Sequence, residues 1–343
     1  MFDRSKPLPV KGVLTQSDGT SWMAMFCLNM MRIALELAQE DPAYQDIASK
    51  FFEHFLLIGG AMTNIGNEGL GLWDDQDKFY YDWLILPSRE KVPVRLRSIV
   101  GLIPLFAVES IDENLLKGAP AFMQRMQWYL SHRPDLAHLI SRPETVGNER
   151  RRLFSIARAY RMKRVLERML DEKEFFSPYG VRAISRVYLD EPYVFKSGSY
   201  SAKVQYTPAE SDSDLFGGNS NWRGPIWMPV NFLMVESLRK FGSFYGDDFR
   251  VECPVGSGQM LSLNEVANEL RTRLTRIFLR DAQGRRPVYN GYEKLQTDPQ
   301  FKDYVWFHEY FDGDNGRGVG ANHQTGWTGL VANLIDELYT PKP

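Results

Sequence analysis

A long apolar run near the N-terminus constrains the fold most. Residues 21–40 read SWMAMFCLNMMRIALELAQE, which places apolar side chains on most faces of an α-helix. This pattern is typical of a helix that is buried on two sides. Asp41 and Pro42 follow as the expected N-cap and first position of a second helix, AYQDIASKFFEHFLLIGGAM. The two segments therefore predict a buried helical hairpin.

Helical patterns also dominate the rest of the chain. Strand-like pieces are short, and irregular loops rich in Gly, Pro and aromatic residues join the helices. Paired helices with aromatics and carboxylates in their loops favour an α/α solenoid or toroid, in which chemistry gathers at one end. The chain has no repeat of fixed short period, which argues against tetratricopeptide or HEAT arrays. Helices are predicted over 100–110, 114–132, 149–172, 229–240, 263–279 and 326–338, strands over 79–86, 187–195 and 200–206, and a helical insertion or lid over 119–172.

Composition excludes several classes of partner. The chain has 41 basic and 43 acidic residues and a net charge of −2, so neither nucleic acid nor an anionic membrane is an expected partner. The basic run over 150–168 is interpreted as the solvated face of a helix, with RNA binding as the minor alternative. No apolar stretch approaches the ~20 residues that span a bilayer, and the N-terminus does not resemble a signal peptide. Cys27 and Cys253 form neither a disulfide framework nor a zinc site. We therefore expect a cytoplasmic protein.

Glu309 is the leading candidate for acid–base chemistry. It lies in residues 306–329, WFHEYFDGDNGRGVGANHQTGWTG, between aromatic residues and ahead of a glycine-rich loop. Apolar surroundings favour the neutral form of a carboxyl group, which suits a residue that exchanges protons. A glycosidase needs two such carboxyl groups on opposite sides of the scissile bond. Spacing alone leaves the second one open among Asp3, Asp18, Asp75 and Asp82.

Two further stretches have the composition of a sugar-binding cleft. Residues 219–231, NSNWRGPIWMPVN, combine Trp222 and Trp227 with the polar Arg223 around a rigid Gly-Pro bend. A sugar pocket and an anchored loop before a helix explain this block equally well. Residues 71–86, GLWDDQDKFYYDWLIL, are interpreted as a turn and an aromatic hairpin. They fail the EF-hand pattern, so no metal is expected, but Tyr81 and Asp82 could point into a cleft.

Phosphoryl-transfer, esterase and zinc-hydrolase motifs are all missing from the sequence. There is no Walker loop, no G-x-S-x-G elbow and no H-E-x-x-H motif, and the five histidines are scattered. The scattered histidines also give little support to a sugar epimerase. Asp18, in QSDGTSW, is interpreted as the N-cap of the first long helix, on a loop within reach of a ligand.

Several blocks together resemble glycoside hydrolase family 63, the family of processing α-glucosidase I and its bacterial relatives. They are FDRSKPLP, LTQSDGTSWMAMFCLNM, GLWDDQDKFYYDWL, PVRLRSIVGLIPLFAVE, GGNSNWRGPIWMPVN and the block around Glu309, and they extend from residue 2 to residue 330. The resemblance implies an all-α (α/α)6 toroid with short β hairpins in its loops. It also implies that residues 1–343 are the C-terminal catalytic part of a longer enzyme, in which some N-terminal helices of the toroid can be missing.

The resemblance further implies an inverting hydrolase of α-glucosidic or related α-glycosidic bonds. Glu309 corresponds to the general base of the family, and Asp3 is the nearest match by position to its general acid. The expected substrate is an oligosaccharide or other glycoside, and no cofactor or metal is needed. The alternative is a non-catalytic carbohydrate-binding or truncated, inactive fragment. Sugar contacts are expected from Asp18, Trp22, Tyr81, Asp82, Trp222, Arg223, Trp227 and Trp327.

Overall fold

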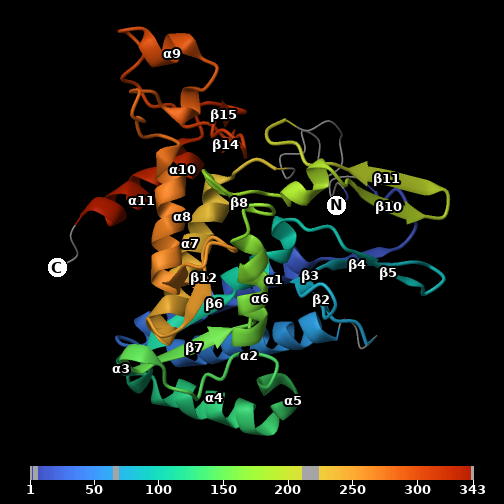
Figure 1. Cartoon of the computed structure of the whole chain (residues 1–343). Coiled ribbons are helices and arrows are strands. Elements are labelled where there is room, and N and C mark those ends of the chain that lie inside the picture. The colour runs from blue at the N-terminus through green and yellow to red at the C-terminus, as the bar shows by residue number, and fades with distance from the viewer. Residues whose placement is uncertain (1, 3–6, 65–68, 211–223, 341–343) are drawn as a thin grey trace.

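The computed structural model describes residues 2, 7–64, 69–210 and 224–340. This part of the chain is mostly helical, with short β hairpins between the helices (Figure 1). The long helices are α1 (Ser17–Leu37), α2 (Tyr44–Thr63), α4 (Pro120–His132), α6 (Ala159–Met169), α7 (Met228–Tyr245), α8 (Leu263–Arg276) and α11 (Leu330–Tyr339). Shorter ones are α3 (Glu113–Lys117), α5 (Pro134–Ala137), α9 (Glu293–Thr297) and α10 (Thr325–Thr328).

The strands are short and pair antiparallel. One sheet has three strands, in the order β1 (Val13–Thr15), β4 (Asp82–Ile85) and β5 (Lys91–Val94). The others are two-stranded: β2 (Trp73–Asp74) with β3 (Phe79–Tyr80), β6 (Val108–Asp112) with β7 (Arg151–Ser155), β8 (Phe176–Ser177) with β9 (Gly180–Val181), β10 (Tyr193–Ser197) with β11 (Tyr200–Val204), β12 (Arg250–Glu252) with β13 (Met260–Ser262), and β14 (Tyr310–Phe311) with β15 (Gly318–Val319).

The predicted N-terminal helical hairpin is confirmed. Helices α1 and α2 pack along each other, and α1 buries Leu28 and Leu35 completely while α2 buries Phe52 and Phe55. The expected N-cap of the second helix is wrong, because α2 begins three residues after Asp41. The Asp41 carboxylate instead accepts the Ala43 N–H at 3.0 Å within the connecting turn.

Two predicted helices, over 100–110 and 149–172, are partly wrong because their sequences pair with each other as strands. After two short 3₁₀ turns the chain enters β6, whose Val108–Asp112 pairs in antiparallel register with β7. Pro104 prevents a regular α-helix through the first segment. The helix predicted over 149–172 survives only as α6, and the helix predicted over 114–132 is divided into α3 and α4 where Pro120 starts a new helix at its first position.

The predicted insertion over 119–172 contains α4, α5, β7 and α6. Within it, β7 pairs with β6, which precedes the segment. Its role as an insertion or lid stays a prediction.

The predicted strands lie near their expected places. Residues 79–86 form β3 and β4, and residues 200–206 form β11. Of the segment 187–195, the first part is a 3₁₀ turn and the rest enters β10, which pairs with β11. The sheet of β4 and β5 and the hairpin of β10 and β11 share a second, smaller core that includes Leu84, Val94 and Phe195.

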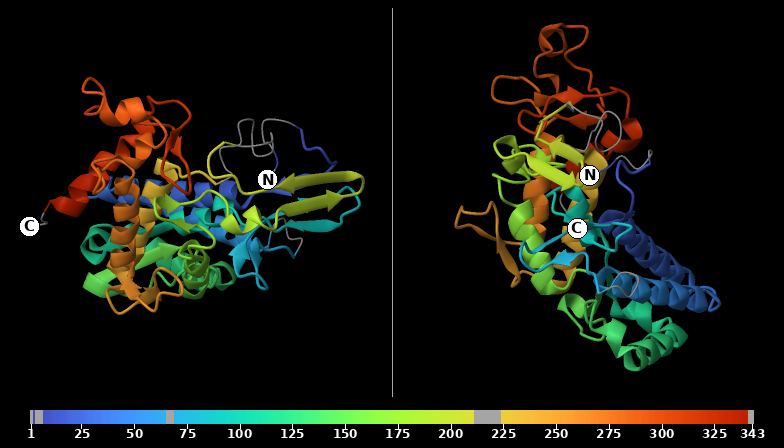
Figure 2. Two further views of the ribbon diagram at one scale, coloured as in Figure 1. Left: turned by 45° about the horizontal axis from the view of Figure 1, so that its top comes forward. Right: turned by 90° about the vertical axis from the view of Figure 1, so that its right-hand side faces the viewer.

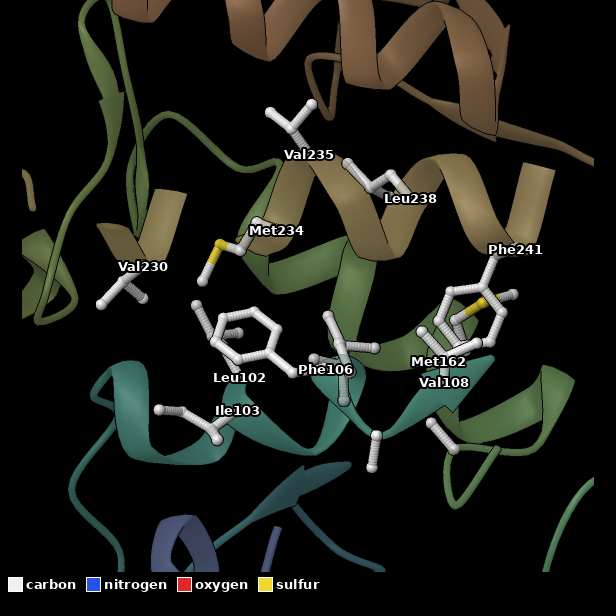
Figure 3. Packing of buried hydrophobic residues seen from close by; sticks show 14 of the residues in the cluster. Leu102, Ile103, Phe106, Val108, Met162, Val230, Met234, Val235, Leu238 and Phe241 are labelled. Carbon is white, nitrogen blue, oxygen red and sulfur yellow. The ribbon is translucent and has the colours of Figure 1, made fainter. Parts of the chain in front are cut away.

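Helices α7 and α8 form an antiparallel pair at the centre of the molecule. Met234 of α7 lies over Leu102 and Phe106 of the 3₁₀ segment, and Phe241 lies beside Met162 of α6 (Figure 3). The N-terminal end of α7 and the C-terminal end of α8 face the segment that carries β14, β15 and α10, and the hairpin of β12 and β13 lies at the other end of the pair (Figures 1 and 2). In the part of the chain that the structure describes, no helix has the length and apolarity required to cross a membrane.

Candidate active site

Glu309 lies directly before β14, in a segment that backbone hydrogen bonds hold on both sides. Its N–H donates to the Ala321 carbonyl at 2.7 Å, which extends the pairing of β14 with β15 by one step. Two residues earlier, Phe307 pairs with His323 in an isolated parallel bridge. The glycine-rich loop therefore folds back on the acid and fixes the position of its backbone.

The Glu309 carboxylate is half-buried and sparsely bonded. Its Oε2 accepts the Ala321 N–H at 3.3 Å, which is its one side-chain hydrogen bond within the described residues. Gly320 lies against it with φ +70°, and a Cβ at this position would be 2.7 Å from both Glu309 Oε2 and Tyr310 Cε1. A glycine is needed here for its backbone conformation and for the space of the carboxylate. Glu309 therefore keeps acceptor capacity for a water molecule or a sugar hydroxyl.

Aromatic rings form a wall beside this carboxylate. Trp227, at the N-cap of α7, is stacked on Tyr310 with ring centroids 5.1 Å apart and also contacts Trp327 at 5.4 Å. Trp227 is buried, but Trp327 is 41% exposed. The structure thus brings Glu309, Trp227 and Trp327 together from two segments that are about eighty residues apart, and it leaves the Trp327 indole partly exposed.

A second carboxylate that the sequence did not indicate belongs to this group. The Tyr310 hydroxyl donates to Glu210 Oε2 at 3.1 Å. Burial raises the pKa of Tyr310, and the charges of Glu210 and Glu309 raise it further. The phenol therefore stays protonated and can donate a hydrogen bond at neutral pH. Glu210 lies 100 residues before Tyr310, in a stretch without a motif, so no sequence signal pointed to it.

The hairpin is attached to the helical body through its neighbours. Ile226, just before α7, forms β-bridges with both Phe311 and Arg182, and a further bridge joins Ser98 to Ile184. On the other side, the Thr328 hydroxyl donates to the His308 carbonyl at 2.5 Å. These bridges form a row of extended segments that connects the Glu309 hairpin with the chain around β5.

His308 is a buried neighbour of this region. Burial lowers its pKa, and the charges of Arg317 and His323 lower it further, so the imidazole is neutral at physiological pH. Neither ring nitrogen has a hydrogen-bond partner among the described residues. Gly318 packs directly against this ring, where a Cβ would be 2.3 Å from His308 Cδ2.

A second group of candidate residues surrounds the start of α1. Asp82 Oδ1 accepts the Ser17 N–H at 2.7 Å and so supplies the cap that satisfies the helix N-terminus. The expected N-cap role of Asp18 is wrong, because Asp18 lies inside the first turn of α1, and its carboxylate accepts the N–H of Gly19 at 2.7 Å. Trp22 lies on the same helix and packs on Phe106.

Tyr81 belongs to a network of ion pairs around Asp77. The Tyr81 hydroxyl donates to Asp77, whose carboxylate also pairs with Arg97 at 2.8 Å and Arg168 at 2.6 Å. Burial works against the ionised form of Asp77, but the hydrogen bonds from Arg97 and Tyr81 and the charge of Arg168 outweigh it, so the pKa of Asp77 is lowered. This network was not foreseen, although Asp77 lies in a stretch that the sequence marks as acidic.

Asp74 has a structural role in the turn between β2 and β3. Its Oδ1 accepts the N–H groups of Gln76 and Asp77, which closes the turn between β2 and β3, and its Oδ2 pairs with Arg95 at 2.8 Å. The interpretation of this stretch as a turn and hairpin is confirmed.

Three candidate residues lie outside the described residues. They are Asp3, the expected general acid, and Trp222 and Arg223 of the WRGPIW block. Their roles stay predictions.

The chain matches the family model described as "Glycosyl hydrolase family 63 C-terminal domain" over residues 152–337, more than half of its length. The chain belongs to glycosyl hydrolase family 63. The matched region includes Glu309, Trp227 and Trp327, and so the whole aromatic group around the candidate base.

The chain is also similar to two proteins of Saccharomyces cerevisiae. The chain is similar to the Saccharomyces cerevisiae protein "Uncharacterized protein YMR196W", with 47% identity over 352 residues, covering 98% of this chain and 32% of the relative. It is 21% identical to the mannosyl-oligosaccharide glucosidase of the same yeast, covering 93% of this chain and 26% of that protein. The family-63 chain thus spans about a third or less of the length of these relatives.

A solved structure of the same family is also similar. It is the GH63 mannosylglycerate hydrolase from Thermus thermophilus in complex with glucose. The superposition covers 94% of this chain and 45% of the hydrolase chain, with 14% sequence identity and a TM-score of 0.44.

Proposed function

We propose that this family-63 chain hydrolyses α-glucosidic or related α-glycosidic bonds with inversion of the anomeric carbon. Glu309 acts as the general base and Asp3 as the general acid. The observation that carries the proposal is the half-buried Glu309 carboxylate, which keeps unused acceptor capacity beside the partly exposed Trp327 indole. The yeast mannosyl-oligosaccharide glucosidase among its relatives supports an oligosaccharide as the substrate.

In this mechanism Glu309 is ionised and accepts a proton from a water molecule. The water attacks the anomeric carbon from the face opposite to the leaving group, and Asp3 donates a proton to the leaving oxygen. An inverting enzyme needs its two carboxyl groups about 6.5–9.5 Å apart, because the water occupies the space between them. The rigid hairpin around Glu309 would hold the base at a constant distance from the sugar.

Aromatic and polar side chains would bind the sugar. The partly exposed Trp327 would pack on the C–H side of a pyranose ring, and its contact with Trp227 would fix its orientation. The Tyr310 hydroxyl is protonated and now donates its hydrogen bond to Glu210. It can donate this hydrogen bond to a sugar oxygen that replaces Glu210 or shares the bond with it. The further contacts that we propose are Asp18, Trp22, Tyr81, Asp82, Trp222 and Arg223, in a C-terminal (α/α)6 catalytic domain of a longer polypeptide.

Kinetics and product stereochemistry together test the proposal. Wild type, Glu309→Gln and Asp3→Asn would be assayed against α-linked glucose disaccharides, with proton NMR of the first-formed anomer. We expect β-glucose as the first product and a loss of about 10²–10⁴-fold in kcat for either variant, because each removes one proton-transfer group.

Three results would speak against parts of this proposal. Equal turnover by the wild type and both variants rejects the catalytic assignment. First release of α-glucose indicates retention instead of inversion. Sugar binding by the wild type without any turnover identifies the chain as a non-catalytic carbohydrate-binding unit.

A further inference from the structure

A large polar cavity lies at the end of the α7–α8 pair opposite Glu309. Its volume is about 860 Å³, and it is bounded by α1, β6, β7, α7, α8 and α11. Lys240 and Ser243 contribute from the C-terminal part of α7, and Asn264 and Asn268 contribute from the first turns of α8. Phe278, just beyond the C-terminal end of α8, instead contacts the hairpin of Glu309. The cavity is therefore separate from the candidate active site.

Positive charge is in excess in this cavity. Five cationic side chains line it and only three carboxylates, Glu109, Glu236 and Glu337. The cations are Arg32, Arg151, Arg239, Lys240 and Arg271.

The carboxylates are already engaged. Lys240 Nζ pairs with Glu109 at 2.8 Å, and Glu337 is shared by Arg239 at 2.9 Å and Arg271 at 3.1 Å. Arg32 pairs with Glu36 at 2.6 Å and Arg151 lies 3.9 Å from Glu149, but both of these carboxylates are exposed and lie outside the lining. The lining itself therefore has two more cations than carboxylates.

Two of the arginines also have unused hydrogen-bonding capacity. The Nε atoms of Arg151 and Arg271 are buried and have no hydrogen-bond partner among the described residues. Arg271 is only 3% exposed. Burial lowers its pKa, and repulsion from Arg239 lowers it further. A bound anion next to Arg239 and Arg271 would offset the repulsion between these two guanidinium groups.

Neutral polar groups complete the lining. Ser110, Ser243, Asn264 and Asn268 offer hydroxyl and amide groups next to the cations, and Ser243 Oγ contacts Ser110 Oγ at 2.9 Å. Guanidinium groups bind phosphate in a forked geometry, and amides and hydroxyls suit alcohol groups. We propose that this cavity binds a small phosphate monoester of a polyol, with the phosphate on the excess cations and the hydroxyls on the serines and asparagines.

Calorimetric titration of the whole chain with glycerol 3-phosphate, inorganic phosphate and glycerol tests the proposal directly. We expect both phosphates to bind, glycerol 3-phosphate more tightly, and glycerol alone not to bind. Affinity should fall with ionic strength, because the attraction is between charges. The readout is independent of hydrolysis, so its outcome does not depend on the proposed catalytic function.

One substitution adds a negative charge to the cavity and keeps the local geometry. Asn268 Oδ1 accepts from Arg271 Nη1 at 2.9 Å, and Asn268→Asp retains this acceptor. Since Asn268 lies on the exposed side of α8, we expect the fold to be kept and the affinity for glycerol 3-phosphate to fall at least tenfold. The matched control is Gln283→Glu, an equal charge change on an exposed turn beyond the other end of α8, which should leave the affinity unchanged.

Arg151→Gln gives a second, independent variant. Arg151 lies on β7 with a side chain that is 28% exposed, so its loss should not prevent folding, and it should weaken phosphate binding about tenfold. Failure of both phosphates to bind the wild type overturns the proposal. Equal affinity in wild type, Asn268→Asp and Arg151→Gln also overturns it, because phosphate would then bind elsewhere.

Discussion

Two stretches of this chain resemble each other in their aromatic residues but differ in how they use an acid. Residues 71–86 and residues 306–329 both place carboxylates among Trp, Tyr and Phe. In the first stretch, Asp77 is fixed by two arginines and a tyrosine, and Asp82 caps a helix. In the second, Glu309 accepts one backbone N–H at 3.3 Å as its side-chain bond within the described chain. The difference teaches that aromatic surroundings do not by themselves mark a reactive acid.

The physical distinction is the number of partners that each carboxylate has. A carboxylate that strong donors surround is held ionised and immobile, so it contributes to stability. A half-buried carboxylate with open acceptor positions can exchange a proton with water or substrate. Substitutions in the two stretches should therefore affect different observables.

After the loss expected on replacing the catalytic carboxyl groups themselves, the largest effect should come from filling the space beside Glu309. Gly320→Ala places a Cβ 2.7 Å from Glu309 Oε2 at a residue with φ +70°, which should displace the carboxylate. We expect kcat to fall about 100-fold, since a shift of ~1 Å in a catalytic group can cost that much. The measurement is the steady-state hydrolysis of an α-linked disaccharide.

Two controls separate displacement from backbone strain. Gly198 also has positive φ, at +57°, but open space around it, and Gly326 has neither a positive φ nor a close neighbour. Alanine at either position should leave kcat unchanged. A loss of activity in Gly198→Ala equal to that in Gly320→Ala would contradict the explanation by displacement.

Substitutions in the first stretch, residues 71–86, should change the free energy of unfolding. Asp77→Asn removes the charge that Arg97 and Arg168 share, and we expect the free energy of unfolding to fall by about 2–3 kcal/mol at neutral pH. Because the pKa of Asp77 is lowered in the folded state, its contribution is present above the unfolded pKa of about 3.9 and is lost as pH falls through the folded value. Urea unfolding of both proteins at several pH values should show the difference shrinking below about pH 4.

Glu309→Gln serves as the cross-check for this prediction. Its free energy of unfolding should stay within about 0.5 kcal/mol of wild type, because Glu309 has no charged partner among the described residues. A large destabilisation by Glu309→Gln, with none by Asp77→Asn, would reverse the comparison.

A smaller effect is expected at the exposed indole. Trp327→Ala should raise KM about tenfold, since stacking of an aromatic ring on a ligand contributes on the order of 1 kcal/mol or more. Trp128 on α4 is a matched control, with 44% exposure against 41% for Trp327, and Trp128→Ala should leave KM unchanged. An unchanged KM in Trp327→Ala would remove this residue from the sugar site.

The smallest effect should appear at the start of α1. Asp82→Ala removes the acceptor of the Ser17 N–H and should lower the free energy of unfolding by about 1 kcal/mol, the usual contribution of a helix cap. Asp82→Asn keeps an oxygen acceptor and should cost much less. Thermal unfolding of the two variants measures this difference, and equal losses would assign the effect to the charge of Asp82 and not to the cap.

The sequence predicted the elements that local periodicity defines. The helices over 21–40, 229–240 and 263–279 correspond to α1, α7 and α8, because their apolar spacing reflects a buried helix face. The sequence did not predict β6 and β7. Their pairing joins residues about forty positions apart, so it depends on contacts that no local window contains.

The features of the candidate site also fall into those that the sequence predicted and those that only the fold shows. Glu309, its aromatic neighbours and the glycine-rich loop are contiguous in the chain, so the sequence by itself determined the candidate base and the family resemblance. Only the tertiary structure decided that Trp227 stacks on Tyr310, that Glu210 accepts from the Tyr310 hydroxyl, that two arginines pair with Asp77 and that Asp82 caps α1. The physical reason is that hydrogen-bond saturation depends on which distant donors the fold brings within about 3 Å of a carboxylate. Residue type and spacing along the chain do not encode that distance.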